Sequence, residues 1–173
     1  MIMSEFNEIG ISLRQGDFID RLMYSSSNGA LICILRNKVD QRTRCFIKTI
    51  EESIYSEVSL PFEAKAFALC SSKVVAINKC ESLVSGKQLW CAFEPFGCIE
   101  KTIGEISLAF NSPNTRRVWV SQFIESDSTR LNCRFGRELK LESGGVTVQY
   151  AVGELNIETG AIELIKDLAT PFA

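Results

Sequence analysis

Apolar residues occur along this chain in short runs that turn sequences separate. The runs are rich in Val, Ile, Phe and Cys, and Asn28-Gly29 and Thr159-Gly160 are among the dipeptides between them. Such runs between Gly-containing turns are typical of β-strands. We predict strands over Phe18–Ser25, Gly29–Arg36, Thr43–Ile50, Ile54–Leu60, Lys65–Cys70, Lys73–Asn78, Gln88–Glu94, Cys98–Leu108, Arg117–Ile124, Arg130–Phe135, Val146–Asn156 and Ala161–Leu168.

Other segments need a choice between alternatives. Apolar and polar residues alternate over 9–14, which predicts an additional strand at the start. Helical spacing also fits 50–58 and 99–106, but β-branched residues in both segments favour strands. Trp90 and Trp119 lie in the middle of predicted strands, so we expect both in the core.

Short sequence matches recur at a nearly constant interval. Ile-Ser-Leu at 11–13, Val-Ser-Leu at 58–60 and Ile-Ser-Leu at 106–108 begin 47 and 48 residues apart. The predicted strands then fall into repeat-like units over 18–60, 64–108 and 117–168. Four antiparallel strands in roughly 40 to 50 residues is the period of a β-propeller blade.

The repeat leads to an expectation for the fold. We expect a single all-β domain over 1–173, built from antiparallel, propeller-like four-stranded repeats of about 48 residues. Because propellers typically have at least four blades and this chain has room for three, a β-sandwich or a barrel is the alternative.

The segment 152–164 carries a resemblance to a known kind of repeat. Its sequence, Val-Gly-Glu-Leu-Asn-Ile-Glu-Thr-Gly-Ala-Ile-Glu-Leu, looks like the strand–turn–strand of quinoprotein-like β-propeller repeats, in which an acidic or Asn-containing strand meets a Thr-Gly turn. The resemblance implies the architecture and nothing about activity, since no Trp-Asp or kelch double-glycine signature accompanies it.

Composition places the chain among ordinary globular proteins. It has 173 residues, 46% of them apolar and 23% charged. A net charge of −2 gives no reason to expect nucleic acid or an anionic membrane as a partner. The first residues form no signal sequence, and no run approaches the roughly 20 apolar residues of a membrane span. We therefore expect a cytoplasmic, bacterial protein.

The absence of histidine excludes several kinds of chemistry. Ser-His-Asp triads, Cys-His pairs and His-based zinc sites all require it. The seven cysteines are odd in number, irregularly spaced and without a Cys-x-x-Cys, so we expect free thiols, mostly buried. Convergence of Cys70, Cys80, Cys91 and Cys98 on a metal is the alternative. We expect no catalytic residue, no metal and no cofactor.

Loop charges suggest two candidate surfaces. In an up-and-down unit, the loops after the first and third strands emerge at one end, and acidic residues collect in these loops. The candidate partner-binding residues there are Glu51, Glu52, Glu94, Asp127 and Glu158, with Phe96 as an exposed apolar anchor. The opposite end carries a secondary basic face of Arg36, Lys38, Arg42 and Arg44.

The function that we expect is protein binding without catalysis. The chain is similar, in its small size and lack of catalytic motifs, to bacterial immunity proteins, which block the active site of a cognate toxin. A nuclease toxin presents Lys and Arg around its cleft, which carboxylates would complement. The alternatives are a scaffold or assembly subunit, and a small-ligand-binding or enzymatic β-domain. Self-association of an incomplete ring is a further expectation.

Overall fold

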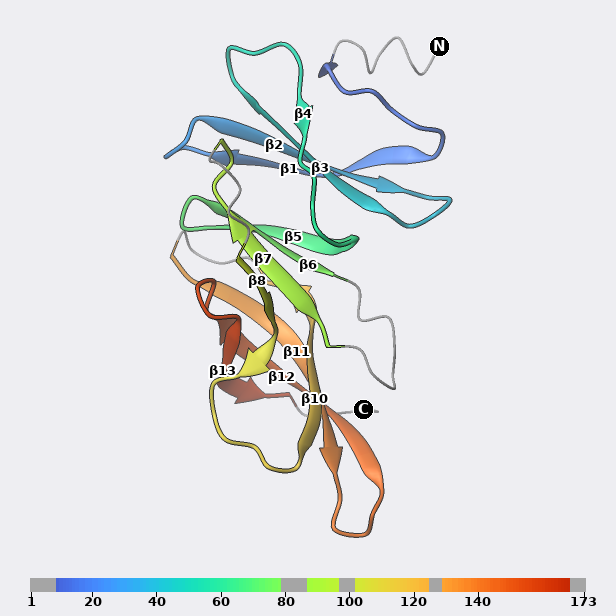
Figure 1. The fold of residues 1–173 in the computed structure, drawn as a ribbon, viewed down its shortest axis with the longest axis vertical. Coiled ribbons are helices and arrows are strands. Elements are labelled where there is room, and N and C mark those ends of the chain that lie inside the picture. Colours follow the sequence, from blue (N-terminus) through green and yellow to red (C-terminus); the bar gives the residue numbers. More distant parts are fainter. Residues whose placement is uncertain (1–8, 79–86, 97–101, 125–128, 169–173) are drawn as a thin grey trace.

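The computed structural model describes residues 9–78, 87–96, 102–124 and 129–168, and strands hold 60% of these residues (Figure 1). The strands are β1 (Asp17–Ser25), β2 (Ala30–Asn37), β3 (Thr43–Thr49), β4 (Ser56–Glu57), β5 (Ala64–Cys70), β6 (Lys73–Asn78), β7 (Leu89–Phe93), β8 (Thr102–Glu105), β9 (Ser107–Leu108), β10 (Thr115–Phe123), β11 (Leu131–Lys140), β12 (Val146–Leu155) and β13 (Ala161–Asp167). The all-β prediction is confirmed, and every strand predicted after residue 14 overlaps an observed one.

The strands form three successive antiparallel meanders, which we call the first (β1–β4), second (β5–β8) and third (β10–β13) meander. A bridge between Thr43 and Ala64 joins the first two into one eight-stranded sheet, in the order β1-β2-β3-β5-β6-β7-β8 with β4 on β3. Separate propeller blades would not share such a bridge. The meanders follow one another along the long axis of the molecule (Figure 1).

The second sheet corresponds to the barrel alternative. Its order is β10-β11-β12-β13-β9, and β9 pairs with β13 in parallel. Because β9 also lies beside β10, the five strands nearly close on themselves.

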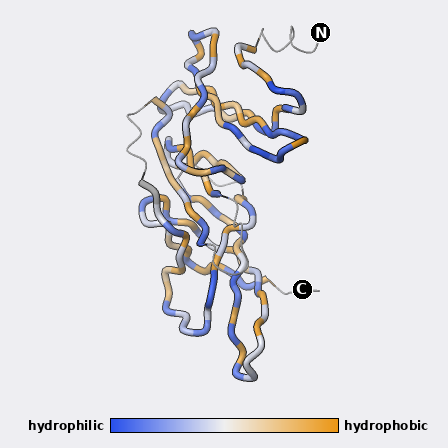
Figure 2. Tube along the Cα trace, turned by 45° about the vertical axis from the view of Figure 1, so that its right-hand side comes forward, coloured by the Kyte–Doolittle hydropathy of each residue, from blue (hydrophilic) through white to orange (hydrophobic). Residues whose placement is uncertain are grey.

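The second meander is the middle layer of the core. Alternate residues of a strand point to opposite faces, and in β6 Val74 and Ala76 pack with the first meander while Val75 and Ile77 pack with the third. All four side chains are fully buried. This explains why β6 reads as a continuous apolar run. Figure 2 shows the hydrophobic residues following the strands through the middle of the molecule.

The predicted strand over 9–14 is wrong. Residues 11–14 lie in no strand, and Ile11 instead packs its buried side chain on Cys33, Leu35 and Phe46 at the outer face of the first meander. The apolar positions of this segment therefore cover a sheet without joining it.

The core prediction for the tryptophans holds for one of them. Trp90 is 1% exposed, and its indole lies against Gly104 and Gly160, where a Cβ atom would clash with the ring. Trp119 is only half-buried; its indole lies over Gly136 and edge-on to Tyr150.

The cysteines within the described ranges are buried, as their positions in apolar runs predict: Cys33, Cys45, Cys70, Cys91 and Cys133. Cys80 and Cys98 lie outside the described residues. Burial raises the pKa of the Cys33 thiol to about 11 and that of Cys133 to about 12. A thiol held neutral in this way is a poor nucleophile.

Candidate functional site

The predicted partner-binding residues lie in three described loops. Glu51 and Glu52 follow β3, Glu94 and Phe96 follow β7, and Glu158 lies in the turn between β12 and β13. All five are exposed, and half of the Phe96 surface is accessible. Asp127 lies outside the described residues.

These carboxylates lack the ion pairs that most other described carboxylates form. Within the described part of the chain, Glu51, Glu52, Glu94 and Glu158 take part in no ion pair, although ten ion pairs hold other carboxylates. Glu52 accepts a hydrogen bond from the neutral backbone N–H of Thr49 at 3.3 Å. The negative charges of this set are therefore available to a partner.

Hydrogen bonds bring the first loops of the three meanders together. The Asn28 amide donates to the carbonyl of Ser72 at 2.9 Å, and the Ser71 hydroxyl donates to the carbonyl of Thr129 at 3.5 Å. The turn that carries Glu158 lies beside the start of β11, because Leu155 pairs with Leu131, and its Gly160 packs on the indole of Trp90. The predicted acidic residues that the structure describes are thus carried by loops of all three meanders.

The predicted basic face is electrostatically compensated. Arg44 forms a hydrogen-bonded ion pair with Asp17, whose side chain is 1% exposed, and a second pair with Glu57. Arg42 lies 3.7 Å from both Asp40 and Glu63. The other two basic residues, Arg36 and Lys38, contact Asp20 at 3.8 Å and the ring of Phe18 at 5.6 Å. These contacts account for the basic cluster as part of the fold.

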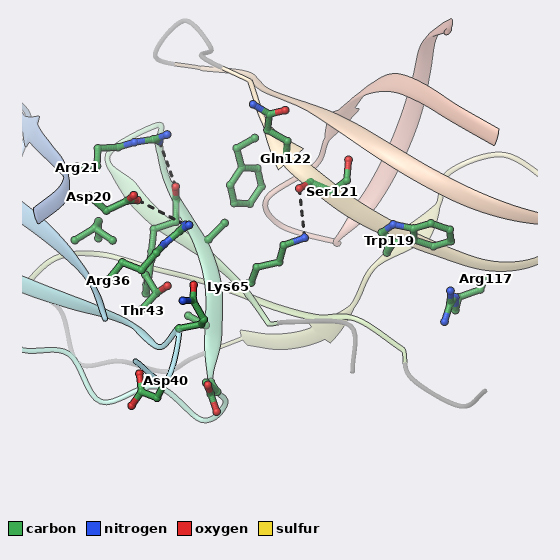
Figure 3. A pocket seen from close by; sticks show the side chains of 17 residues that line it. Asp20, Arg21, Arg36, Asp40, Thr43, Lys65, Arg117, Trp119, Ser121 and Gln122 are labelled. Atoms are coloured by element: carbon green, nitrogen blue, oxygen red, sulfur yellow. Dashed lines mark hydrogen bonds and ion pairs between the residues drawn. The ribbon is translucent and has the colours of Figure 1, made fainter. Parts of the chain in front are cut away.

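Sequence reasoning missed a cleft of about 800 Å³ where the first strands of the three meanders meet (Figure 3). The residues that line it come from β1, β2, β3, β5 and β10 and from the adjoining turns. In Figure 3 the side chain of Lys65 extends between Asp20, Arg21 and Arg36 on one side and Trp119, Ser121 and Gln122 on the other.

Each of these first strands contains a β-bulge at the cleft. The register shifts lie between Ile19 and Arg21 in β1, between Ala64 and Ala66 in β5, and between Val120 and Gln122 in β10. The extra residues are Asp20, Lys65 and Ser121, and all three line the cleft. A bulge redirects a side chain and is common beside functional sites. No residue pattern in the sequence marks these positions.

The described residues also limit the chemistry that can be assigned. In the described ranges, no group of three or more Cys, Asp and Glu side chains is placed to hold a metal ion. The described part of the chain contains no helix that is long and apolar enough to cross a membrane. Comparison of the chain with protein-family models, curated proteins and solved structures gave no match. The function is therefore proposed from the geometry of the described residues alone.

Proposed function

We propose that the protein is a non-catalytic protein-binding module that binds a basic surface of its partner through Glu51, Glu52, Glu94 and Glu158, with Phe96 as an apolar anchor. The observation that carries this proposal is the contrast in pairing: these exposed carboxylates have no ion-pair partner among the described residues, whereas the predicted basic residues contact acids or an aromatic ring.

Unpaired carboxylates and an exposed aromatic ring affect different steps of binding, namely association and dissociation. Surface charges accelerate the encounter with an oppositely charged partner, and this effect weakens as salt screens it. A buried aromatic ring contributes mainly to how slowly the complex dissociates. Glu94 and Phe96 are separated by a single residue, so both could lie in one interface.

The narrower form of the proposal is that the partner is a toxin and that this protein neutralises it as an immunity protein. A toxin that binds nucleic acid must present Lys and Arg around its cleft, because phosphate binding depends on those charges. Exposed carboxylates on loops complement such a cleft.

The test uses the protein encoded by the adjacent reading frame as the candidate partner. We expect Glu51→Lys/Glu52→Lys to slow association about tenfold at low salt and less at physiological salt. Phe96→Ala should instead accelerate dissociation. The matched control is Glu142→Lys, an exposed carboxylate in the turn between β11 and β12.

Two results would contradict the proposal. One is an equal loss of association rate for Glu142→Lys and the double variant, which would indicate a net-charge effect without a site. The other is binding that both Glu51→Lys/Glu52→Lys and Phe96→Ala leave unchanged. Rescue of cells that express the partner tests the narrower toxin hypothesis separately, because binding without rescue supports a scaffold.

A further inference from the structure

We infer that the cleft between the three meanders is a separate binding site for an acidic peptide segment, in which Arg21 and Lys65 hold carboxylate side chains of the peptide. The site is distinct from the acidic loops of the proposed function and carries the opposite charge. Three observations support the inference: the bulges, the pairing of the charged groups, and the mixture of polar and apolar residues that lines the cleft.

The bulges show that the fold directs side chains into the cleft. A regular strand would alternate its side chains, but the extra residue in each of β1, β5 and β10 brings Asp20, Lys65 and Ser121 to the same space. Bulges on β1 and β10 also hinder pairing with an added strand at the sheet edges. The peptide is therefore held by side chains more than by its backbone.

The charges that remain uncompensated in the cleft are positive. The carboxylates of Asp40 and Glu63 lie 3.7 Å from Arg42, and Asp20 pairs with Arg36 at 3.8 Å. In contrast, the hydrogen-bond acceptors of Arg21 and Lys65 are the backbone carbonyls of Phe67 and Ser121, each at 3.4 Å. A carbonyl oxygen carries no formal charge, and both cations retain donors for a carboxylate.

The remaining lining favours a peptide over a polyphosphate or nucleic acid. Carboxylates alternate with the cations of the cleft, so it presents isolated positive charges and not the dense row of cations that a polyphosphate or nucleic acid binds. Apolar groups also line it, among them Phe67 and Trp119. A peptide in which acidic and apolar side chains alternate matches both kinds of wall, and the cleft volume lies within the range of ligand sites.

The test measures binding of a labelled peptide of alternating Glu and Val to the full chain, at low and physiological salt, with the Gln/Val peptide as its neutral control. The emission of Trp119 gives a second readout from inside the cleft, and Trp119→Phe identifies that signal. We expect Lys65→Met and Gln122→Glu each to weaken binding about fivefold or more. Gln122 is exposed in the cleft, so this second variant removes no contact between meanders.

The matched control is Lys73→Met, because Lys73 is a half-buried lysine of β6 that does not line the cleft. It should bind the Glu/Val peptide as the unaltered protein does, and so should Glu51→Lys/Glu52→Lys. Equal affinity for the Gln/Val peptide would overturn the inference. So would full binding by Gln122→Glu, or displacement of the peptide by inorganic pyrophosphate at lower concentration than by unlabelled peptide, which would indicate a phosphate site.

Discussion

The side-chain amide of Gln88 makes with Val120 the two hydrogen bonds that a neighbouring strand would make. Its Nε2 donates to the Val120 carbonyl at 3.1 Å, and the Val120 N–H donates to Oε1 at 2.6 Å. The same Nε2 donates to the carbonyl of Asn78 at 3.0 Å. Gln88 is 1% exposed, so one buried side chain connects the second meander to β10 of the third.

Replacement of this side chain should destabilise the protein. Gln88→Ala leaves the buried N–H and carbonyl of Val120 without partners, and we expect a loss of about 2 to 4 kcal/mol in the free energy of unfolding. Denaturant titration measures it. The control, Gln122→Ala, removes an exposed amide of β10 and should change stability by no more than about 0.5 kcal/mol. Equal effects of the two variants would show that the Gln88 bridge contributes nothing.

The contact between Gly160 and Trp90 leads to a second prediction. Gly160 has a φ of +74°, and a Cβ atom there would lie 1.9 Å from the Trp90 indole nitrogen. We expect Gly160→Ala to cost about 3 kcal/mol or more, from backbone strain and from displacement of the ring. Gly29 has a φ of +62° with open space around its Cβ position, so Gly29→Ala measures the strain alone, about 1 kcal/mol. A similar loss in both would exclude the steric contribution.

Local pattern was sufficient to find the strands because each one carries its own apolar run and turn. The hairpin from β5 to β6 was predicted at Ser71 and Ser72, which both adopt positive φ in the absence of glycine. The strand prediction for 9–14 was wrong because alternating apolar and polar residues indicate a buried face and do not specify whether the backbone pairs with another strand. Ile11 buries its side chain on Phe46 without joining a sheet.

The cleft could not be predicted because its position depends on strand register. Asp20, Lys65 and Ser121 line it through bulges, and a bulge arises from how two strands pair rather than from the composition of either. The sum of loop charges also placed Arg44 in the predicted basic face. The structure pairs it with the buried Asp17, which lies 27 positions away in the sequence.

The Arg44–Asp17 pair gives a third prediction. Asp17 also accepts hydrogen bonds from the Asn37 amide at 2.8 Å and from the Arg14 N–H at 2.7 Å, so its charge is fixed in place. Arg44→Met should cost about 3 to 5 kcal/mol, because it leaves a buried carboxylate without its cation. Arg42→Met removes an exposed cation and should cost no more than about 1 kcal/mol. The midpoints of thermal unfolding compare the two variants. Equal midpoints would show that Arg44 contributes no more to stability than an exposed cation does.

The buried thiols predict a loss of stability at alkaline pH. Burial raises the pKa of Cys33 to about 11 and of Cys133 to about 12, against 9.0 for an unperturbed thiol. Above pH 9 the unfolded chain releases these protons while the native state retains them, so the native state binds more protons and its stability falls as pH rises. The stabilisation is complete below pH 9 and declines towards the native pKa of each thiol.

Each of these thiols should contribute a decrease of about 1 kcal/mol in the free energy of unfolding between about pH 8 and pH 10. Tyr55, whose pKa burial also raises, acts in the same direction. Denaturant titrations under reducing conditions measure the slope, and Cys133→Ala should make it shallower even though the variant is less stable throughout. Cys133 is the better test because it packs in the core cluster between the second and third meanders, whereas Tyr55 packs with Cys33 on the first. An unchanged slope in Cys133→Ala would mean that this thiol ionises in the native state, and rapid reaction of native Cys133 with a thiol reagent would accompany it.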